Sequence, residues 1–132
     1  MTTKITVLAM IQDLNKKEIS LKPALIDTSD TLHEMYRILG CNTVDCVSIE
    51  INDKYYDIWC DDEALLQANP IPTLYVDEDL MIFGNLLFAT SSEEGETRGL
   101  TALDMAILMS YIKKQDAKLT AWVEAINKEV GD

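Results

Sequence analysis

The tightest constraint on the fold comes from residues 43–63, which read TVDCVSIEINDKYYDIWCDDE. Two alternating runs flank Asn52 and Asp53, and both of these residues tolerate the positive φ of a two-residue hairpin turn. The segment therefore predicts a β-hairpin in which Ile51 pairs with Lys54. Counting back from that pair places apolar side chains on one face and mainly polar side chains on the other. The predicted pairs are Ile49–Tyr56 and Val47–Ile58 on the apolar face, and Cys46–Trp59, Ser48–Asp57 and Glu50–Tyr55 on the polar face.

Length and composition favour one globular domain. The chain has 132 residues, 48% of them hydrophobic, which is enough for one core and ordinary for a folded protein. No window approaches 18 uninterrupted apolar residues, so we expect no membrane-spanning helix. The N-terminal run, MTTKITVLAMIQDLN, lacks the small-residue cleavage site of a signal peptide. We therefore expect a cytoplasmic protein.

The charge is strongly acidic. The chain has 23 acidic and 11 basic residues, which gives a formal net charge of −12. Such a surface repels nucleic acids and anionic membranes, so we expect direct binding to neither. One interpretation is a solvated surface that keeps the protein soluble. The other is that the acidic groups imitate the phosphates of DNA and occupy the groove of a basic protein.

Three further segments have strand patterns. Residues 4–12 are largely apolar on both sides, which is typical of a strand inside a sheet. Residues 18–22 alternate and precede Pro23, so this second strand is expected to lie at an edge or to be interrupted there. Residues 86–90 read as another buried strand. Between residues 91 and 99 the sequence SSEEGETRG has no apolar residue and predicts a mobile loop.

Residues 30–39 predict a helix. Thr31 and Glu34 have the spacing of a capping box, and Gly40 stands where a left-handed C-cap is expected. His33 lies off the apolar stripe and is expected to face solvent. The stripe consists of Leu32, Met35, Tyr36 and Leu39.

The last third of the chain is expected to be helical. No proline or glycine occurs from Thr101, the predicted N-cap, to residue 130, so the segment forms one long helix or two joined near residues 113–118. Residues 102–112 should pack on the sheet. The later stripe either folds back on the same domain or packs against a second copy, and we expect a homodimer through it. Its candidate interface residues are Leu119, Trp122 and Ile126.

Residues that carry catalysis do not form a recognisable set. The chain has one histidine, and its glycines do not form a phosphate-binding loop. The three cysteines, Cys41, Cys46 and Cys60, lack the spacing of a zinc site and predict reduced thiols. We therefore expect no enzyme activity, no cofactor and no bound metal.

The best binding candidates lie on the polar face of the hairpin. An indole beside carboxylates can hold an aromatic or cationic group. The alternative is that the C-terminal helices cover this face, because residues 102–112 are so apolar. The candidate residues are Tyr55, Asp57, Trp59 and Asp61.

The segments around the hairpin carry a family resemblance. LHEMYRILGCNTVDCVSIEI enters the hairpin, WCDDEALL with its Asn-Pro follows it, and IFGNLLFAT comes next. In these motifs the chain resembles a family of small uncharacterised acidic proteins from phages, plasmids and integrative elements of Gram-positive bacteria. The resemblance spans residues 28–112, with Cys41 and Ala64 where the family commonly has glycine. It implies a mobile-element setting and a shared domain fold, but it transfers no activity and no functional residue.

Together these patterns predict an α+β fold. The sheet is expected to be small and mainly antiparallel, with four or five strands, helices packed on one face and a C-terminal helical extension. Residues 1–112 would form the single α+β domain, and residues 113–132 would form the extension.

The expected function is that of a non-catalytic accessory protein of a phage or mobile genetic element, which acts by binding a protein partner. If the acidic surface imitates the phosphates of DNA, that partner is a basic protein. The alternative is a small-ligand or nucleotide-binding protein that uses the polar face of the hairpin. Binding an anionic nucleotide would require several basic residues at one site. The basic residues that could form such a site are Lys4, Lys16, Lys17, Lys22, Arg37, Lys54 and Arg98.

Overall fold

The computed structural model describes residues 3–13, 15, 18–64, 72–77 and 79–130, without the side chains of residues 122, 123 and 126–130. The elements are β1 (Lys4–Asp13), β2 (Glu18–Asp27), the 3₁₀ turn η1 (Thr28–Asp30), α1 (Thr31–Leu39), β3 (Val44–Ile51), β4 (Lys54–Asp61), β5 (Pro72–Asp77), β6 (Leu80–Phe83), β7 (Leu86–Ser91), β8 (Thr97–Arg98) and α2 (Ala102–Val130). The main sheet has the antiparallel order β2-β1-β7-β4-β3, with β8 beside β7, and β5 and β6 form a separate ribbon. The α+β class predicted from the sequence is confirmed.

The hairpin of β3 and β4 has the predicted register. Its pairs run from Val44 opposite Asp61 to Ile51 opposite Lys54 without a shift, and each pair expected from the sequence is present. Asn52 and Asp53 have φ values of 52° and 64°, the left-handed conformation of a turn that matches the twist of the two strands. The local alternation and the turn residues specify the same register, which explains why the prediction holds.

β1 lies between β2 and β7, as its apolar residues on both sides predict. β2 is an edge strand, but it continues through Pro23, which lies opposite Leu8. Just beyond the strand, the amide of Thr28 donates to the carbonyl of Thr3. Every second residue before Thr28, beginning with Ile26, therefore directs its backbone N–H and C=O groups toward β1. Pro23 falls between these residues, so its backbone groups point outward. An outward position needs no N–H, so the proline does not interrupt the ladder.

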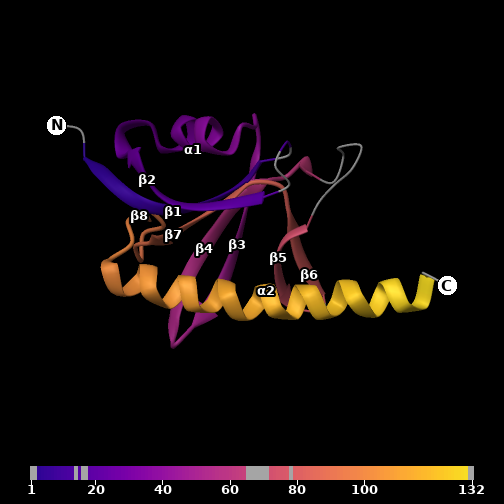
Figure 1. The fold of residues 1–132 in the computed structure, drawn as a ribbon. Coiled ribbons are helices and arrows are strands. Elements are labelled where there is room, and N and C mark those ends of the chain that lie inside the picture. The colour runs from indigo at the N-terminus through magenta and orange to yellow at the C-terminus, as the bar shows by residue number, and fades with distance from the viewer. Residues whose placement is uncertain (1–2, 14, 16–17, 65–71, 78, 131–132) are drawn as a thin grey trace.

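The two helices cover opposite faces of the sheet (Figure 1). Met35 and Leu39 of α1 pack on the side chains that include Val7 of β1. Leu108 of α2 packs on the other face, in a cluster that includes Tyr56. The prediction that helices lie on one face is therefore wrong. β1 and β7 are apolar on both sides, so each face of the sheet needs a cover.

The start of α1 differs from the prediction. The Asp27 carboxylate accepts the amide of Ser29 at 2.9 Å and caps the 3₁₀ turn, whereas Asp30, the N-cap of α1, makes no side-chain cap bond. Glu34 accepts a hydrogen bond from Arg37 at 2.8 Å instead of closing a capping box. The predicted capping box is therefore wrong, because the helix has Asp30 rather than Thr31 as its N-cap and Glu34 bonds Arg37.

The rest of α1 follows the sequence pattern with one exception. Gly40 has a φ of 66°, and its amide donates to the Tyr36 carbonyl at 2.8 Å, which confirms the left-handed C-cap. Met35 and Leu39 are buried, but Leu32 is 48% exposed and does not belong to the buried stripe.

α2 is one continuous helix through residues 113–118, where the sequence was compatible with either one long helix or two joined helices. Thr101 caps it as predicted: the Asp104 amide donates to the Thr101 hydroxyl at 3.1 Å, and the Thr101 amide donates to the Asp104 carboxylate at 2.9 Å. Gln115 lies beyond residue 112 and is still buried. Its amide group donates to the carbonyls of Tyr75 and Val76, at 2.7 and 2.9 Å, and fixes the helix to the β5–β6 ribbon.

Two other segments complete the fold. Residues 91–99, which the sequence predicts to be a mobile loop, contain β8 and a tight turn in which the backbone amide of Ser92 donates to the Glu96 carbonyl at 2.8 Å. Gly84 has a φ of 76°, and a Cβ there would lie 2.9 Å from Ala64 Cβ, so this turn requires glycine. The sequence DDEALLQA at residues 61–68 also predicts a short helical turn, which falls largely outside the described residues. Within the part described, no helix is long and apolar enough to cross a membrane.

Candidate functional site

The hairpin has an inner face toward α2 and an outer face on the side of α1. Tyr56 and Ile58 lie on the inner face and are fully buried with α2 residues such as Leu108. The alternative that the C-terminal helix covers the polar face is therefore wrong. The outer face carries Cys46, Ser48 and Glu50 from β3, and Tyr55, Asp57, Trp59 and Asp61 from β4.

The four candidate binding residues share this outer face, but they do not form one exposed site. Tyr55 is 66% exposed, whereas Asp57 is buried and accepts a hydrogen bond from the Ser48 hydroxyl at 3.0 Å. Trp59 packs against the cluster of α1 and β1, and Asp61 accepts the amide of Glu63 at 2.9 Å. Only Tyr55 presents most of its side chain to a partner.

The indole of Trp59 is not a surface donor. Its nitrogen is buried and has no hydrogen-bond partner within the described part of the chain. Met35 and Leu39 of α1 belong to the buried cluster against which Trp59 packs. Trp59 therefore links the hairpin to α1 by apolar contact, and although the side chain is only half-buried, its ring nitrogen is not open to a partner.

Tyr55 and Glu50 form the exposed pair of the outer face. They lie opposite each other in the register, and a hydrogen bond from the phenol to Glu50, together with the negative charge of that carboxylate, raises the pKa of Tyr55. Beside them, partial burial and the charges of Asp57 and Asp45 raise the pKa of Cys46 to about 11. The thiol is therefore protonated at neutral pH, which makes it a poor nucleophile.

The three cysteines are free, as predicted. Cys46 is on the outer face and exposed, whereas Cys60 points to the inner face and is buried. Opposite directions on paired strands prevent a disulfide between them.

The hairpin carries an excess of negative charge. Residues 44–63 contain seven carboxylates and one cation, Lys54, for a formal charge of −6. The Lys54 ammonium donates to Asp104 of α2 at 2.9 Å, so this cation is bonded on the inner face. The outer face is left with carboxylates and no cation of its own.

Asp104 is the centre of a buried polar cluster that the sequence showed only in part. Its carboxylate accepts from Lys54, from the Tyr56 hydroxyl at 2.8 Å and from the Thr101 amide at 2.9 Å. Burial alone raises the pKa of Asp104, but these hydrogen bonds outweigh it and hold the pKa at about 2. Burial and the bond to Asp104 raise the pKa of Tyr56 to about 12. The capping pattern predicted the Thr101 contact, whereas the hairpin partners are about 50 residues away in sequence.

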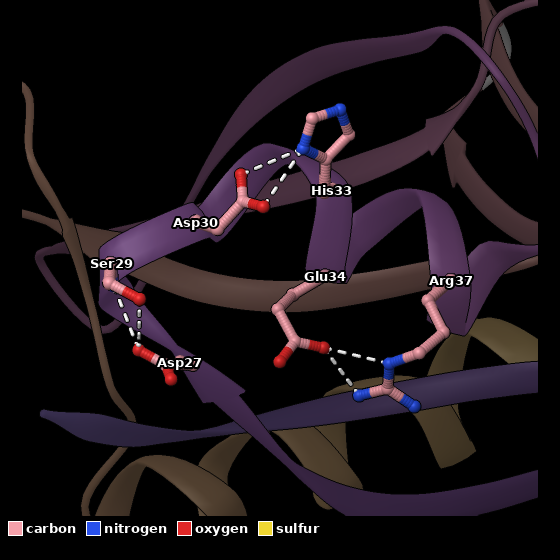
Figure 2. A network of polar contacts seen from close by, with 6 residues as sticks. All are labelled: Asp27, Ser29, Asp30, His33, Glu34 and Arg37. Atoms are coloured by element: carbon pink, nitrogen blue, oxygen red, sulfur yellow. Dashed lines mark hydrogen bonds and ion pairs between the residues drawn. The ribbon is translucent and has the colours of Figure 1, made fainter. Parts of the chain in front are cut away.

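The single histidine lies in an exposed network on α1, shown in Figure 2. His33 Nδ1 lies 2.9 Å from both carboxylate oxygens of Asp30, and its side chain is 75% exposed. The hydroxyl of Ser29 donates to Asp27 at 2.8 Å and not to the imidazole. The serine, histidine and aspartate are neighbours in sequence but do not form a catalytic triad. The expectation that His33 faces solvent is confirmed.

The basic residues are dispersed. Arg37 pairs with Glu34 at 2.6 Å on α1, and Arg98 lies 3.7 Å from Glu96 on the β7–β8 hairpin. Of the other basic residues considered for nucleotide binding, Lys4 lies on β1 and Lys22 on β2, and Lys16 and Lys17 are outside the described residues. Among the residues with a described position, no group of three or more histidine, cysteine or acidic side chains is arranged to hold a metal ion.

The fold and this surface define an antiparallel α+β domain with an acidic, partly exposed hairpin. Residues 11–115 match the family described as Domain of unknown function (DUF3846), and the chain belongs to that family. The match starts within β1 and ends at Gln115, so it includes the hairpin and the part of α2 that packs on it. No curated protein and no solved structure matches the chain.

Proposed function

We propose that this protein is a non-catalytic, cytoplasmic accessory protein of a phage or other mobile genetic element, and that it binds a protein partner through the acidic hairpin. The observation that carries the proposal is the charge of residues 44–63, whose single lysine is already bonded to Asp104. The mobile-element setting rests on the sequence resemblance described above.

The physical argument concerns charge complementarity. A concentrated patch of one sign attracts a partner of the opposite sign and speeds its association. Tyr55 adds a large exposed ring within this patch, and tyrosine is common among residues that contribute most to protein binding. The expected partner is therefore a protein with a basic surface.

Nucleotide binding, the alternative function, has less support. The described cations lie on several elements, and Arg37 and Lys54 are bonded to carboxylates. The exposed lysines Lys113 and Lys114 lie on α2, across the sheet from the outer face. An anionic ligand at Tyr55 would therefore meet carboxylates, and we do not propose one.

A capture experiment with isosteric variants tests the proposal. The hairpin variant combines Asp45→Asn, Glu50→Gln and Asp62→Asn, whose amide oxygens can still accept the hydrogen bonds made by these side chains. The control variant removes the same charge from the β7–β8 hairpin by Glu93→Gln, Glu94→Gln and Glu96→Gln. At low salt, the wild type and the control should retain the same host proteins from a lysate, and the hairpin variant should lose them.

The salt dependence provides the second measurement. Partners held by exposed charges should be released as the ionic strength rises, because screening shortens the range of the attraction. Equal capture by the hairpin variant and the control would refute the role of the hairpin, and so would the absence of any basic protein at low salt.

We also propose a homodimer through the C-terminal part of α2. Leu119, Trp122 and Ile126 recur at three- and four-residue steps, which places them on one side of the helix. Leu119 is half-buried, and the side chains of the other two are outside the described residues. The helix extends 15 residues beyond Gln115, or about 22 Å at 1.5 Å per residue.

Sedimentation of full-length variants tests the homodimer. Trp122→Glu should shift the protein to a monomer, because a charge would be buried in an apolar interface. Ala121→Glu places the same charge at an exposed position one residue earlier and should remain a dimer. A monomeric wild type would end the proposal.

A further inference from the structure

The two edges of the main sheet are protected to different degrees. β2 contains Lys22 and Pro23, and both residue types discourage another strand from pairing with an edge. β3 contains neither lysine nor proline, and its eight residues pair with β4 without a bulge. Among the described residues, β3 is bonded by β4 alone, so its other side remains a free edge.

The register shows which backbone groups of β3 point away from β4. In a hairpin closed by a two-residue turn, the flanking pair, here Ile51 and Lys54, is hydrogen-bonded, and bonded pairs then alternate with non-bonded pairs. The outward residues are therefore Val44, Cys46, Ser48 and Glu50. The amide of Cys46 donates to the Asp45 carboxylate at 2.9 Å, which agrees with an outward direction.

A groove lies beside the same strand on the inner face, between the hairpin and β6. It has a volume of about 160 Å³. Val47 and the β6 residues 80–83 are its main apolar lining residues, and the acidic residues Asp45, Asp61 and Asp62 also line it. An occupant would meet apolar surface and negative charge together.

We propose that an extended, basic segment of the partner protein adds to the sheet as a strand along β3. Its backbone would bond the outward groups of Ser48 and Glu50, as in other cases of strand addition. Successive side chains of a strand point to opposite faces, so apolar residues would alternate with lysine or arginine. The apolar residues would enter the groove, and the basic residues would meet Glu50 and Tyr55 on the outer face. This inference rests on the proposed function and specifies the form of its partner.

Charge favours this occupant over a second copy of the chain. Pairing β3 with another β3 would join two hairpins of formal charge −6 each. Like charges on neighbouring strands are destabilising, and a basic strand reverses the sign of that interaction. The acidic residues of β3 therefore oppose pairing of two copies along this edge and select a basic partner.

A synthetic peptide provides the probe. It has the length of β3, eight residues, with lysine and valine alternating and both ends blocked. A second peptide of the same composition has all lysines before all valines. The alternating peptide should bind more tightly, and hydrogen exchange measured by NMR should slow at the Ser48 and Glu50 amides when it binds.

Three variants test the backbone contact. Ser48→Pro removes one outward N–H and should weaken binding about tenfold. Ser48→Ala keeps that N–H and removes only the hydroxyl bonded to Asp57, so it should bind within about twofold of the wild type. Leu25→Pro makes the same type of change at an outward, exposed position of β2, two residues after Pro23, and should leave binding unchanged.

The outcomes separate this inference from the proposed function. If Ser48→Pro binds as the wild type does while the hairpin variant with three neutralised acids loses binding, the acidic surface is correct and strand addition is wrong. Equal binding of both peptides, or unchanged exchange at Ser48 and Glu50 in the bound state, would also refute strand addition. Failure of the lysate experiment would refute the proposed function itself.

Discussion

On the inner face of the hairpin, Tyr56 is fully buried and donates its hydroxyl to Asp104, whereas its neighbour Tyr55 on the outer face is 66% exposed and bonds Glu50. These two residues have the same side chain and are adjacent in one strand. They differ because successive side chains of β4 point to opposite faces of the sheet, so the two rings lie on different faces. One face therefore stabilises the fold, and the other remains available to a partner.

The two faces also treat charge differently. On the inner face, Asp104 accepts bonds from Lys54, Tyr56 and Thr101, so its burial is compensated. The exposed Glu50 of the outer face has no cation beside it on the strands. Apart from the Tyr55 hydroxyl, the strands offer this carboxylate no side-chain donor, so its burial would be costly and this face stays in water until a partner supplies more donors.

The largest expected effect separates the two tyrosines. Tyr56→Ala should lower the free energy of unfolding by about 4 kcal/mol, because it leaves a cavity under α2 and removes a donor to Asp104. Tyr55→Ala should leave the urea midpoint nearly unchanged, since that ring packs against little. Urea unfolding of both variants measures the comparison, and similar losses would show that the two faces do not differ in this way.

The second effect depends on pH. The pKa of Asp104 is about 2 in the folded protein and 3.8 ordinarily, so the folded state binds its proton less readily than the unfolded chain. This contribution to stability is present above pH 3.8 and is lost as the pH falls through about 2. By linkage it amounts to about 2 kcal/mol. Asp104→Asn should be less stable than the wild type at neutral pH, and the difference should shrink toward pH 2.

A matched variant controls for the removal of one negative charge. Glu93→Gln changes the same charge at an exposed turn and should alter stability by no more than about 0.5 kcal/mol. If the difference between wild type and Asp104→Asn stayed constant down to pH 2, the buried carboxylate would not be the group that titrates.

A smaller effect is expected where α2 leaves the main sheet. Gln115→Ala deprives the Tyr75 and Val76 carbonyls of their donor and should cost about 1–2 kcal/mol. Lys114→Ala, at the exposed preceding position, should cost much less. Hydrogen exchange of the β5 amides should increase only in the Gln115 variant, and equal exchange in both would contradict a role of Gln115 in holding the ribbon.

The elements with local signals could be predicted from the sequence. Asn52 and Asp53 specify the turn, and the alternation on each side specifies the register, so the hairpin required no knowledge of the rest of the chain. The same holds for Gly40 and for the Thr101 cap, since each depends on residues within one turn of a helix. The interior position of β1 followed from its apolar residues on both sides.

The long-range arrangement could not be predicted in this way. An apolar stripe shows that a helix packs but not on which face of a sheet, and β1 and β7 offer apolar surface on both. Similarly, the sequence placed Asp57 and Trp59 on the outer face but could not show that Asp57 and the ring nitrogen of Trp59 are buried. Their neighbours across the strand, Ala89 and Leu87, come from β7, about 30 residues further along the chain.

The smallest expected effect on stability concerns the exposed acidic residues of the hairpin. The hairpin variant with Asp45→Asn, Glu50→Gln and Asp62→Asn should unfold within about 0.5 kcal/mol of the wild type. The sign should be a slight stabilisation, because removing three carboxylates from a chain of net charge −12 reduces its self-repulsion. Urea unfolding at low salt measures this change. A large loss of stability would mean that these acids support the hairpin itself, and any loss of partner capture would then follow from unfolding.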